Sequence, residues 1–185
     1  MVRLLVAALD SELVAFPPEL DGFDRLVTGA GKLPAAVRLA RALDAHPYEE
    51  IVVVGTAGGL DPALDPGVHE VTTALQHDVT DLAGVVGRHI TLPERVGTGD
   101  GVVIATGDSF VDDAEAVGVI RGLGAQLVDM ETYAYLWVAD ELDVPIRVFK
   151  AISDTAQDGA TQTWDETVTA CSALLLAHLR EVYGV

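Results

Sequence analysis

Short apolar runs alternate along the chain with stretches in which apolar residues recur at helical spacing. Residues 4–9 form a continuous apolar run, and residues 51–54 form another that ends at Gly55. Runs of this kind are typical of strands that are covered on both faces. Further strands are predicted at residues 25–28, 70–75, 102–106, 127–130 and 146–152.

Three helices are predicted between these strands. Residues 34–43 have apolar positions on one side, and Pro47 blocks continuation of that helix. A second helix follows residue 130 and extends to about residue 141, and a third covers residues 163–182. Alternating strands and helices predict one α/β domain over residues 1–185, built on a largely parallel or mixed sheet.

The glycine-rich stretch from residue 80 to residue 101 is the least regular part of the chain. Five glycines and Pro93 interrupt it, so a loop or a weak hairpin is expected there.

The chain is strongly acidic, with 29 Asp and Glu residues against 11 Lys and Arg residues, and its net charge is −18. This balance argues against nucleic acid or an anionic membrane surface as a partner, since both need clustered basic residues. We expect most of the charge to form a solvated surface that keeps the protein in solution. A neutral or positively charged small molecule is compatible with it.

Cysteine and histidine usage limits the chemistry further. Cys171 is the only cysteine, so no intrachain disulfide is possible and a cytoplasmic location is expected. It lies in a helical apolar stretch with no base nearby, which favours a buried structural role. The five histidines are scattered, and no pair has metal-ligand spacing, so no metal is expected. No apolar run reaches the roughly 18 residues of a membrane span, and the N-terminal segment turns acidic too early for a signal peptide.

Small, hydroxylic or acidic residues follow five of the predicted strands. They are Asp10-Ser11-Glu12, Gly55-Thr56-Ala57-Gly58-Gly59, Gly107-Asp108-Ser109-Phe110, Asp129-Met130-Glu131 and Ser153-Asp154. Ligands of open α/β sheets bind at the carboxyl ends of the strands. These residues therefore predict one site rich in carboxylates and glycines. The glycine segment has neither the P-loop pattern nor the dinucleotide fingerprint, and a tight strand-to-loop turn would also explain it.

Four ordered segments carry a resemblance to a known family. They read IVVVGTAGGL at residues 51–60, IATGDSF at 104–110, VDMET at 128–132 and KAISDTA at 150–156. Together they resemble the purine nucleoside phosphorylase and nucleosidase superfamily, closest to its 5′-methylthioadenosine/S-adenosylhomocysteine nucleosidases. The resemblance implies a three-layer phosphorylase/hydrolase-like fold with a central mixed sheet flanked by helices. It also implies cleavage of the N-glycosidic bond of a purine nucleoside without a cofactor.

Three carboxylates receive roles from this resemblance. Asp154 is expected to be the general acid that protonates purine N7, and Glu12 the base that polarises the attacking water. Glu131 is expected to accept hydrogen bonds from the ribose 2′ and 3′ hydroxyls. Each residue also has a simpler interpretation. Asp154 would suit a helix cap, and the two glutamates would suit the first turn of a helix.

The resemblance assigns seven further residues to substrate binding, namely Thr56, Gly58, Phe110, Val111, Met130, Ser153 and Trp164. Phe110 is expected to stack on the purine while the backbone of Val111 reads the base edge. Met130 would pack against the sugar, and Thr56 stands where the nucleosidases usually carry serine. Trp164 corresponds to an aromatic lid residue, although a tryptophan that opens an amphipathic helix is often part of the core.

Water is favoured over phosphate as the nucleophile. Phosphorylases need basic residues that hold a phosphate beside the sugar, whereas residues 8–13 contain no basic residue. Lys150 stands where the family usually has an arginine before Ala-Ile-Ser-Asp. A lysine cannot make the two parallel hydrogen bonds of an arginine, so the contacts that support Glu131 are expected to be weaker than, or different from, those in the family.

Alternatives remain open within and outside this class. A futalosine hydrolase or a phosphate-dependent purine nucleoside phosphorylase would use similar residues, and a non-catalytic nucleoside-binding module is the alternative of another class. The chain is shorter than the family's nucleosidases, mainly between residues 79 and 102. In the family that region helps to cover the 5′ substituent across a dimer interface, so a homodimer is expected and the 5′ group is left undetermined.

Overall fold

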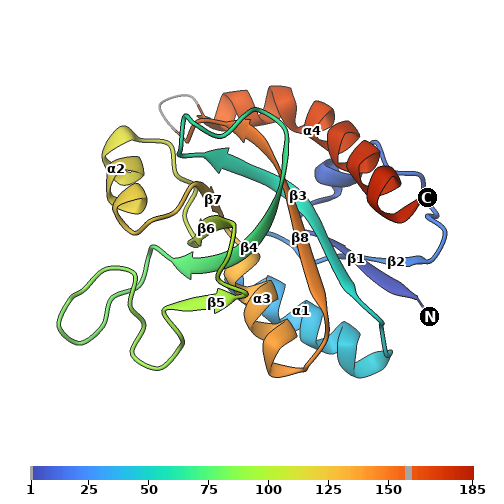
Figure 1. Cartoon of the computed structure of the whole chain (residues 1–185), viewed down its shortest axis with the longest axis horizontal. Helices are drawn as coiled ribbons and strands as arrows, with labels where there is room; N and C mark the ends of the chain where they lie inside the picture. Colours follow the sequence, from blue (N-terminus) through green and yellow to red (C-terminus); the bar gives the residue numbers. More distant parts are fainter. Residues whose placement is uncertain (1, 157–159) are drawn as a thin grey trace.

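A mixed sheet forms the centre of the molecule (Figure 1). The computed structural model describes residues 2–156 and 160–185. The strands are β1 (Arg3–Ala7), β2 (Phe23–Val27), β3 (Ile51–Gly59), β4 (Val68–Gln76), β5 (Arg95–Gly97), β6 (Val102–Thr106), β7 (Leu127–Asp129) and β8 (Ile146–Asp154). The helices are η1 (Asp10–Leu13, a 3₁₀ helix), α1 (Lys32–Ala45), α2 (Ala114–Gly122), α3 (Thr132–Glu141) and α4 (Ala160–Tyr183).

The strand pairings bring several carboxyl ends together. β1 runs parallel to β2 and β3, and β3 runs parallel to β8 along most of its length. The end of β3 pairs antiparallel with β7, which lies parallel to β6. β4 pairs parallel with β6 and antiparallel with β8, so β3, β7, β6, β4 and β8 form a closed ring. The ends of β1, β3, β7 and β8 therefore meet at one edge of the sheet.

Helices cover both faces of this sheet. α1 and α3 lie on one face and α4 on the other, while α2 lies beside the ends of β6 and β7 (Figure 1). One apolar cluster joins Leu4, Val53 and Ile104 to residues of α1 and α3. A second cluster joins Leu5, Val52 and Phe149 to the apolar side of α4. The predicted three-layer fold with a central mixed sheet is confirmed.

The predicted order of elements is confirmed, although some lengths differ. Residues 102–106 form β6 as predicted, and the irregular 80–101 stretch contains only β5 and a bridge between Thr80 and Val86. β3 does not end at Gly55 but continues to Gly59, because its glycines fit close packing. A Cβ at Gly58 would lie 3.0 Å from both Ala156 Cβ and Val128 Cγ1. Helix α2 was not predicted.

Cys171 is buried, as expected. Across residues 2–156 and 160–185, no helix has both the length and the apolar character needed to cross a membrane.

Candidate active site

A cavity of about 340 Å³ lies where the ends of β1, β3, β7 and β8 meet. Its walls come from those ends, from the loop before α2 and from the first turns of α4. All ten residues expected at the site line it: Glu12, Thr56, Gly58, Phe110, Val111, Met130, Glu131, Ser153, Asp154 and Trp164. The three carboxylates among them are nearly buried, with 4% (Glu12), 5% (Glu131) and 7% (Asp154) of the residue exposed.

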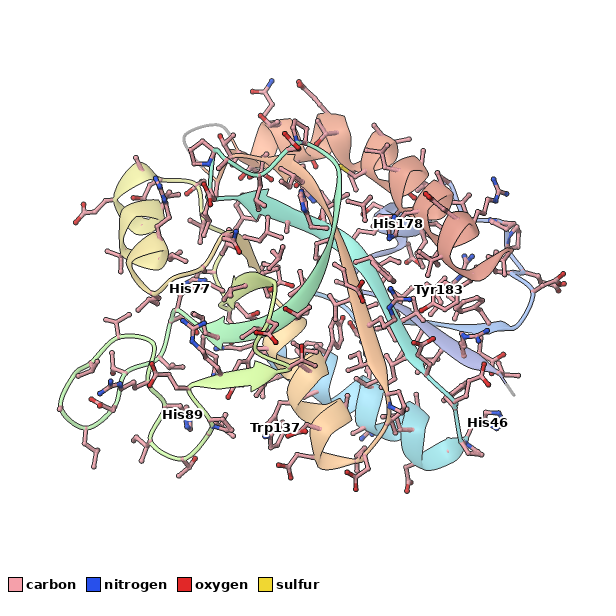
Figure 2. The ribbon with its side chains drawn as sticks, viewed as in Figure 1. His46, His77, His89, Trp137, His178 and Tyr183 are labelled. Carbon is pink, nitrogen blue, oxygen red and sulfur yellow. The ribbon has the colours of Figure 1, made fainter. Side chains whose placement is uncertain are left out.

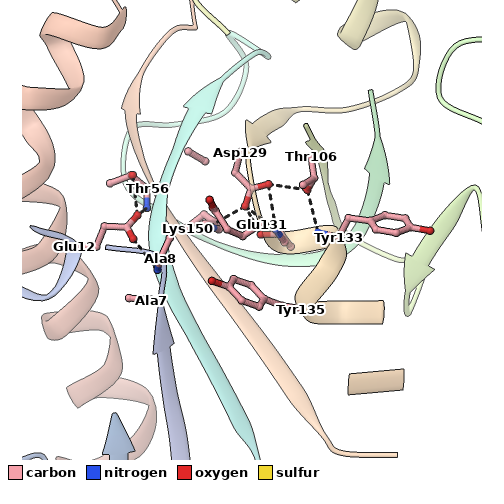
Figure 3. Close-up of polar contacts among 12 residues, drawn as sticks. Ala7, Ala8, Glu12, Thr56, Thr106, Asp129, Glu131, Tyr133, Tyr135 and Lys150 are labelled. Atoms are coloured by element: carbon pink, nitrogen blue, oxygen red, sulfur yellow. Dashed lines mark hydrogen bonds and ion pairs between the residues drawn. The ribbon is translucent and has the colours of Figure 1, made fainter. Parts of the chain in front are cut away.

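Glu12 is held by four hydrogen bonds (Figure 3). Its Oε2 accepts from the backbone N–H groups of Ala8 and Leu9, at 3.1 and 3.0 Å. Its Oε1 accepts from the backbone N–H of Thr56 at 2.7 Å and from the Thr56 hydroxyl at 3.0 Å. Glu12 thus satisfies the start of η1, as its simpler interpretation requires, and also links β1 to β3 at the cavity wall.

Glu131 reaches across the molecule instead of capping its own helix. It precedes α3 but makes no side-chain capping bond there, and its Oε1 accepts a 2.8 Å hydrogen bond from Gly31 N–H. Burial, together with the negative charge of Asp129, raises the pKa of Glu131 from 4.5 to about 8. The nearby Lys150 ammonium and the Gly31 N–H act in the opposite direction but are outweighed. Glu131 therefore holds a proton at neutral pH.

Lys150 and Asp129 form a buried ion pair behind Glu131 (Figure 3). Lys150 Nζ lies 2.9 Å from Asp129 Oδ2, and each side chain is only 2% exposed. Asp129 also accepts hydrogen bonds from the hydroxyls of Thr106 and Thr132, at 2.7 and 2.5 Å. Burial alone would lower the pKa of Lys150, but the three surrounding carboxylates, Asp129 first, raise it. The lysine therefore stays charged and pairs with Asp129.

Close approach of Lys150 and Glu12 explains the glycine at position 55. A Cβ at Gly55 would lie 2.9 Å from Glu12 Oε1 and 3.0 Å from Lys150 Nζ. A side chain there would push both charged groups out of place. The glycine segment is thus neither a phosphate loop nor a turn but a strand that leaves room for charges.

Asp154 is the last residue of β8, and its carboxylate is held in place by its neighbours. Ser153 Oγ donates to Oδ2 at 2.7 Å, and the backbone N–H of Ala156 donates to Oδ1 at 2.7 Å. Ala156 has a φ of 55°, an unusual conformation for a residue with a Cβ. Thr155 is not helical, so the helix-cap interpretation of Asp154 is wrong.

Phe110, Val111 and Trp164 add aromatic and apolar surface to the cavity wall. Phe110 is 44% exposed at its mouth, next to the nearly buried Val111. Trp164, on the first turns of α4, is half-buried and donates from Nε1 to Thr56 Oγ1 at 2.8 Å.

Sequence reasoning missed several residues that line the cavity or hold its walls. The missed lining residues are Ala8, Leu9, Ala30, Val128, Thr161 and Asp165. Ala57, Ser109 and Asp129 also line the cavity; they lie in the strand-end segments that predicted the site but received no role of their own. Asp129 stands within the VDMET segment, but nothing in that segment showed that it would pair with Lys150. The Gly31 N–H that binds Glu131 is 100 residues away in sequence, and no local pattern could have identified it.

Histidines take no part in the cavity lining. Figure 2 shows His46, His77, His89 and His178 spread over different elements. In the part of the chain that the structure describes, no group of three or more His, Cys, Asp or Glu side chains is arranged to hold a metal ion. His77 packs against Gly107, and burial lowers its pKa.

The chain is similar to proteins of known family. The sequence profile of the phosphorylase superfamily matches residues 94–182. The chain is 30% identical over 165 residues to the 5′-methylthioadenosine/S-adenosylhomocysteine nucleosidase of Bacillus subtilis (strain 168), an alignment that covers 76% of this chain and 71% of that protein.

Two solved structures have a similar fold. The Neisseria meningitidis 5′-methylthioadenosine/S-adenosylhomocysteine nucleosidase in complex with methylthio-immucillin-A superposes with a TM-score of 0.81 and 26% identity, over 96% of this chain and 97% of that chain. A futalosine hydrolase mutant of Helicobacter pylori strain 26695 has a TM-score of 0.86 and 19% identity, with 97% of each chain covered, and shows a likeness of fold alone.

Proposed function

This chain belongs to the family of 5′-methylthioadenosine/S-adenosylhomocysteine nucleosidases within the phosphorylase superfamily, and from that membership we propose that it hydrolyses a 5′-substituted purine nucleoside to the free base. The preferred substrates are 5′-methylthioadenosine and S-adenosylhomocysteine. The observation that carries the proposal is the convergence of three nearly buried carboxylates, Glu12, Glu131 and Asp154, on one cavity.

Asp154 is assigned to the leaving base. As the C1′–N9 bond breaks, its electron pair moves into the purine, and Asp154 donates a proton to N7. The hydrogen bonds from Ser153 and Ala156 hold the carboxyl group in one orientation, so its proton is delivered from a fixed position. Phe110 and Val111 line the same cavity and are assigned to the base, Phe110 to stack on the purine and the Val111 backbone to bind the base edge.

Glu131 and Met130 are assigned to the ribose. When the nucleoside binds, its hydroxyls favour the ionised form of Glu131, which gives up its proton. The carboxylate then accepts two hydroxyl hydrogen bonds, and its negative charge stabilises the positive charge that develops on the sugar. The Gly31 N–H binds only Oε1 of Glu131, so Oε2 is available to the sugar hydroxyls.

Glu12 is assigned to the water. Its carboxylate accepts a proton from the water as the water oxygen bonds to C1′, which balances the proton that Asp154 gives to the base. The cavity lining supports water over phosphate, because no lysine or arginine is among the described residues that line it.

A homodimer would complete the cavity mouth. Phe110 is 44% exposed there, and Leu82 and Ile90 in the shortened 79–102 region are 89% and 61% exposed. Exposed apolar side chains that gather in one patch mark protein–protein interaction surfaces. We propose that a second copy of the chain covers this edge.

Released base, measured by chromatography, tests the function. We expect adenine from 5′-methylthioadenosine and S-adenosylhomocysteine in phosphate-free buffer, with no increase when phosphate is added. Futalosine and unsubstituted adenosine complete the panel and show whether the 5′ group matters. Release that requires phosphate, or no release from any nucleoside, would overturn the proposal.

A further inference from the structure

The Thr56 hydroxyl lies between two side chains of the candidate site. Trp164 Nε1 donates to Thr56 Oγ1 at 2.8 Å, and Thr56 Oγ1 donates to Glu12 Oε1 at 3.0 Å. An indole N–H is only a donor and an ionised carboxylate only an acceptor. The direction of this chain is therefore fixed, from Trp164 through Thr56 to Glu12.

Thr56 supplies the one adjustable hydrogen bond that Glu12 receives. The other three donors to its carboxylate are backbone N–H groups, one in β3 (Thr56) and two in the turn between β1 and η1 (Ala8 and Leu9). A hydroxyl can rotate about its C–O bond, and its proton then no longer points at the carboxylate. Because Trp164 occupies a lone pair of Thr56 Oγ1, it favours the rotamer in which the hydroxyl proton points at Glu12.

The first turns of α4 are tied to the cavity at a second point. Thr167, three residues after Trp164, shares the proton of its Oγ1 between the backbone oxygens of Ser153, at 2.9 Å, and Thr163, at 2.8 Å. Ser153 in turn donates to Asp154. This tether fixes the helix turn that carries the indole, so the N–H of Trp164 meets Thr56 at a defined position.

We propose that Trp164 is a positioning residue for Glu12 and acts through the Thr56 hydroxyl, an inference that rests on the proposed function. The four donors use the roughly four acceptor sites of the Glu12 carboxylate and hold it in one orientation, so the water reaches Oε1 beside a Thr56 hydroxyl whose proton points at the carboxylate and not at the water. Without the indole N–H, the Thr56 hydroxyl competes for the same water and turns away from the carboxylate. Turnover falls, whereas purine binding, which needs only the aromatic surface, is kept.

Kinetics of four variants test this inference. Trp164→Phe keeps the ring and removes the N–H, and we expect kcat to fall about 10-fold with KM within about twofold, the scale of one hydrogen bond. Thr56→Val removes the hydroxyl and should lower kcat at least as far, whereas Thr56→Ser should restore it. The double variant Trp164→Phe/Thr56→Val should match Thr56→Val alone, because the indole has lost its target.

Trp137→Phe is the matched control, since Trp137 lies on α3, on the other face of the sheet from α4 (Figure 2). It should leave kcat and KM unchanged. Multiplicative losses in the double variant, or a Trp164→Phe loss that appears in adenine affinity rather than in kcat, would overturn the inference. A Thr56→Ser variant as slow as Thr56→Val would overturn it too, because the hydroxyl would then not matter.

A spectroscopic signature separates this inference from the proposed function. The chain has two tryptophans, so its ¹⁵N-labelled spectrum contains two indole N–H signals. Thr56→Val should shift the Trp164 signal and leave the Trp137 signal in place, even if the wild-type protein released no base. An unmoved Trp164 signal in a folded Thr56→Val protein overturns the inference, whereas an inactive wild type overturns only the proposed function.

Discussion

Replacing Glu131 by glutamine should make the protein more stable at alkaline pH. Glutamine keeps an oxygen that can accept from Gly31 N–H, as Glu131 Oε1 does at 2.8 Å, but it never ionises. In the wild type, ionising Glu131 places a negative charge in a buried position next to Asp129. The substitution removes that cost and little else.

The size and sign of the effect follow from the pKa of Glu131. It rises from 4.5 to about 8 on folding, a shift of about 3.5 units, and each unit is worth about 1.36 kcal/mol. The folded protein therefore binds more protons than the unfolded chain between these values. The stabilising contribution is fully present below pH 4.5 and is lost as the pH rises to about 8. The loss totals about 5 kcal/mol at most.

Urea denaturation at pH 5, 6.5 and 8.5 measures the effect. The free energy of unfolding of Glu131→Gln should match the wild-type value at pH 5 and exceed it by several kcal/mol at pH 8.5. Other titrating groups are common to both proteins, so they cancel in the difference. Glu181→Gln, at an exposed position on α4, should give no difference at any pH. A Glu131→Gln difference that stays constant from pH 5 to 8.5 would refute the reasoning.

Three further predictions concern the same cavity. Asp154→Asn should lower turnover at least 10²-fold, the usual scale of general acid catalysis, with a much smaller loss of adenine affinity by calorimetry; unchanged turnover would contradict the acid role. Lys150→Met should lower the free energy of unfolding at pH 7 by about 3 kcal/mol, because Asp129 is left buried without its ammonium; a near-wild-type urea midpoint would show that the pair contributes nothing. Binding of an uncleaved nucleoside analogue at pH 7 should release a proton from Glu131, since ribose hydroxyls favour its ionised form. The binding enthalpy of the analogue should then differ between phosphate and Tris buffers, because the buffer takes up the released proton. Adenine alone, which lacks the ribose, should give the same binding enthalpy in both buffers.

Much of the fold could be predicted because buried strands have continuous apolar sequences, as at residues 51–54 and 102–106. The lengths of the strands were harder to predict. Gly55 and Gly58 suggested a break, yet each lies where a Cβ would meet a neighbour, which only the packed sheet reveals. Helix α2 was not predicted because Gly118 and Gly122, residues of low helix propensity, interrupt its apolar pattern.

The cavity residues could be proposed from motifs at strand ends, but their mutual contacts could not. The buried partnership of Lys150 with Asp129 depends on how β8 and β7 are arranged around β3. Nor does a tryptophan at position 164 indicate by itself that its N–H will meet Thr56, 108 residues earlier. Long-range polar contacts of this kind are set by tertiary structure.

The closed ring of strands has a consequence for the order in which the protein folds. β8 pairs with β3 and with β4, which precede it by roughly 80 to 95 residues, and no ring exists before β8 arrives. During synthesis, the edges of β3 and β4 that await β8 stay open and invite pairing with other chains. Folding should be slow for a protein of this size, because the closing contacts span so much of the sequence. The candidate active-site cavity, one wall of which comes from the end of β8, would be among the last parts to form.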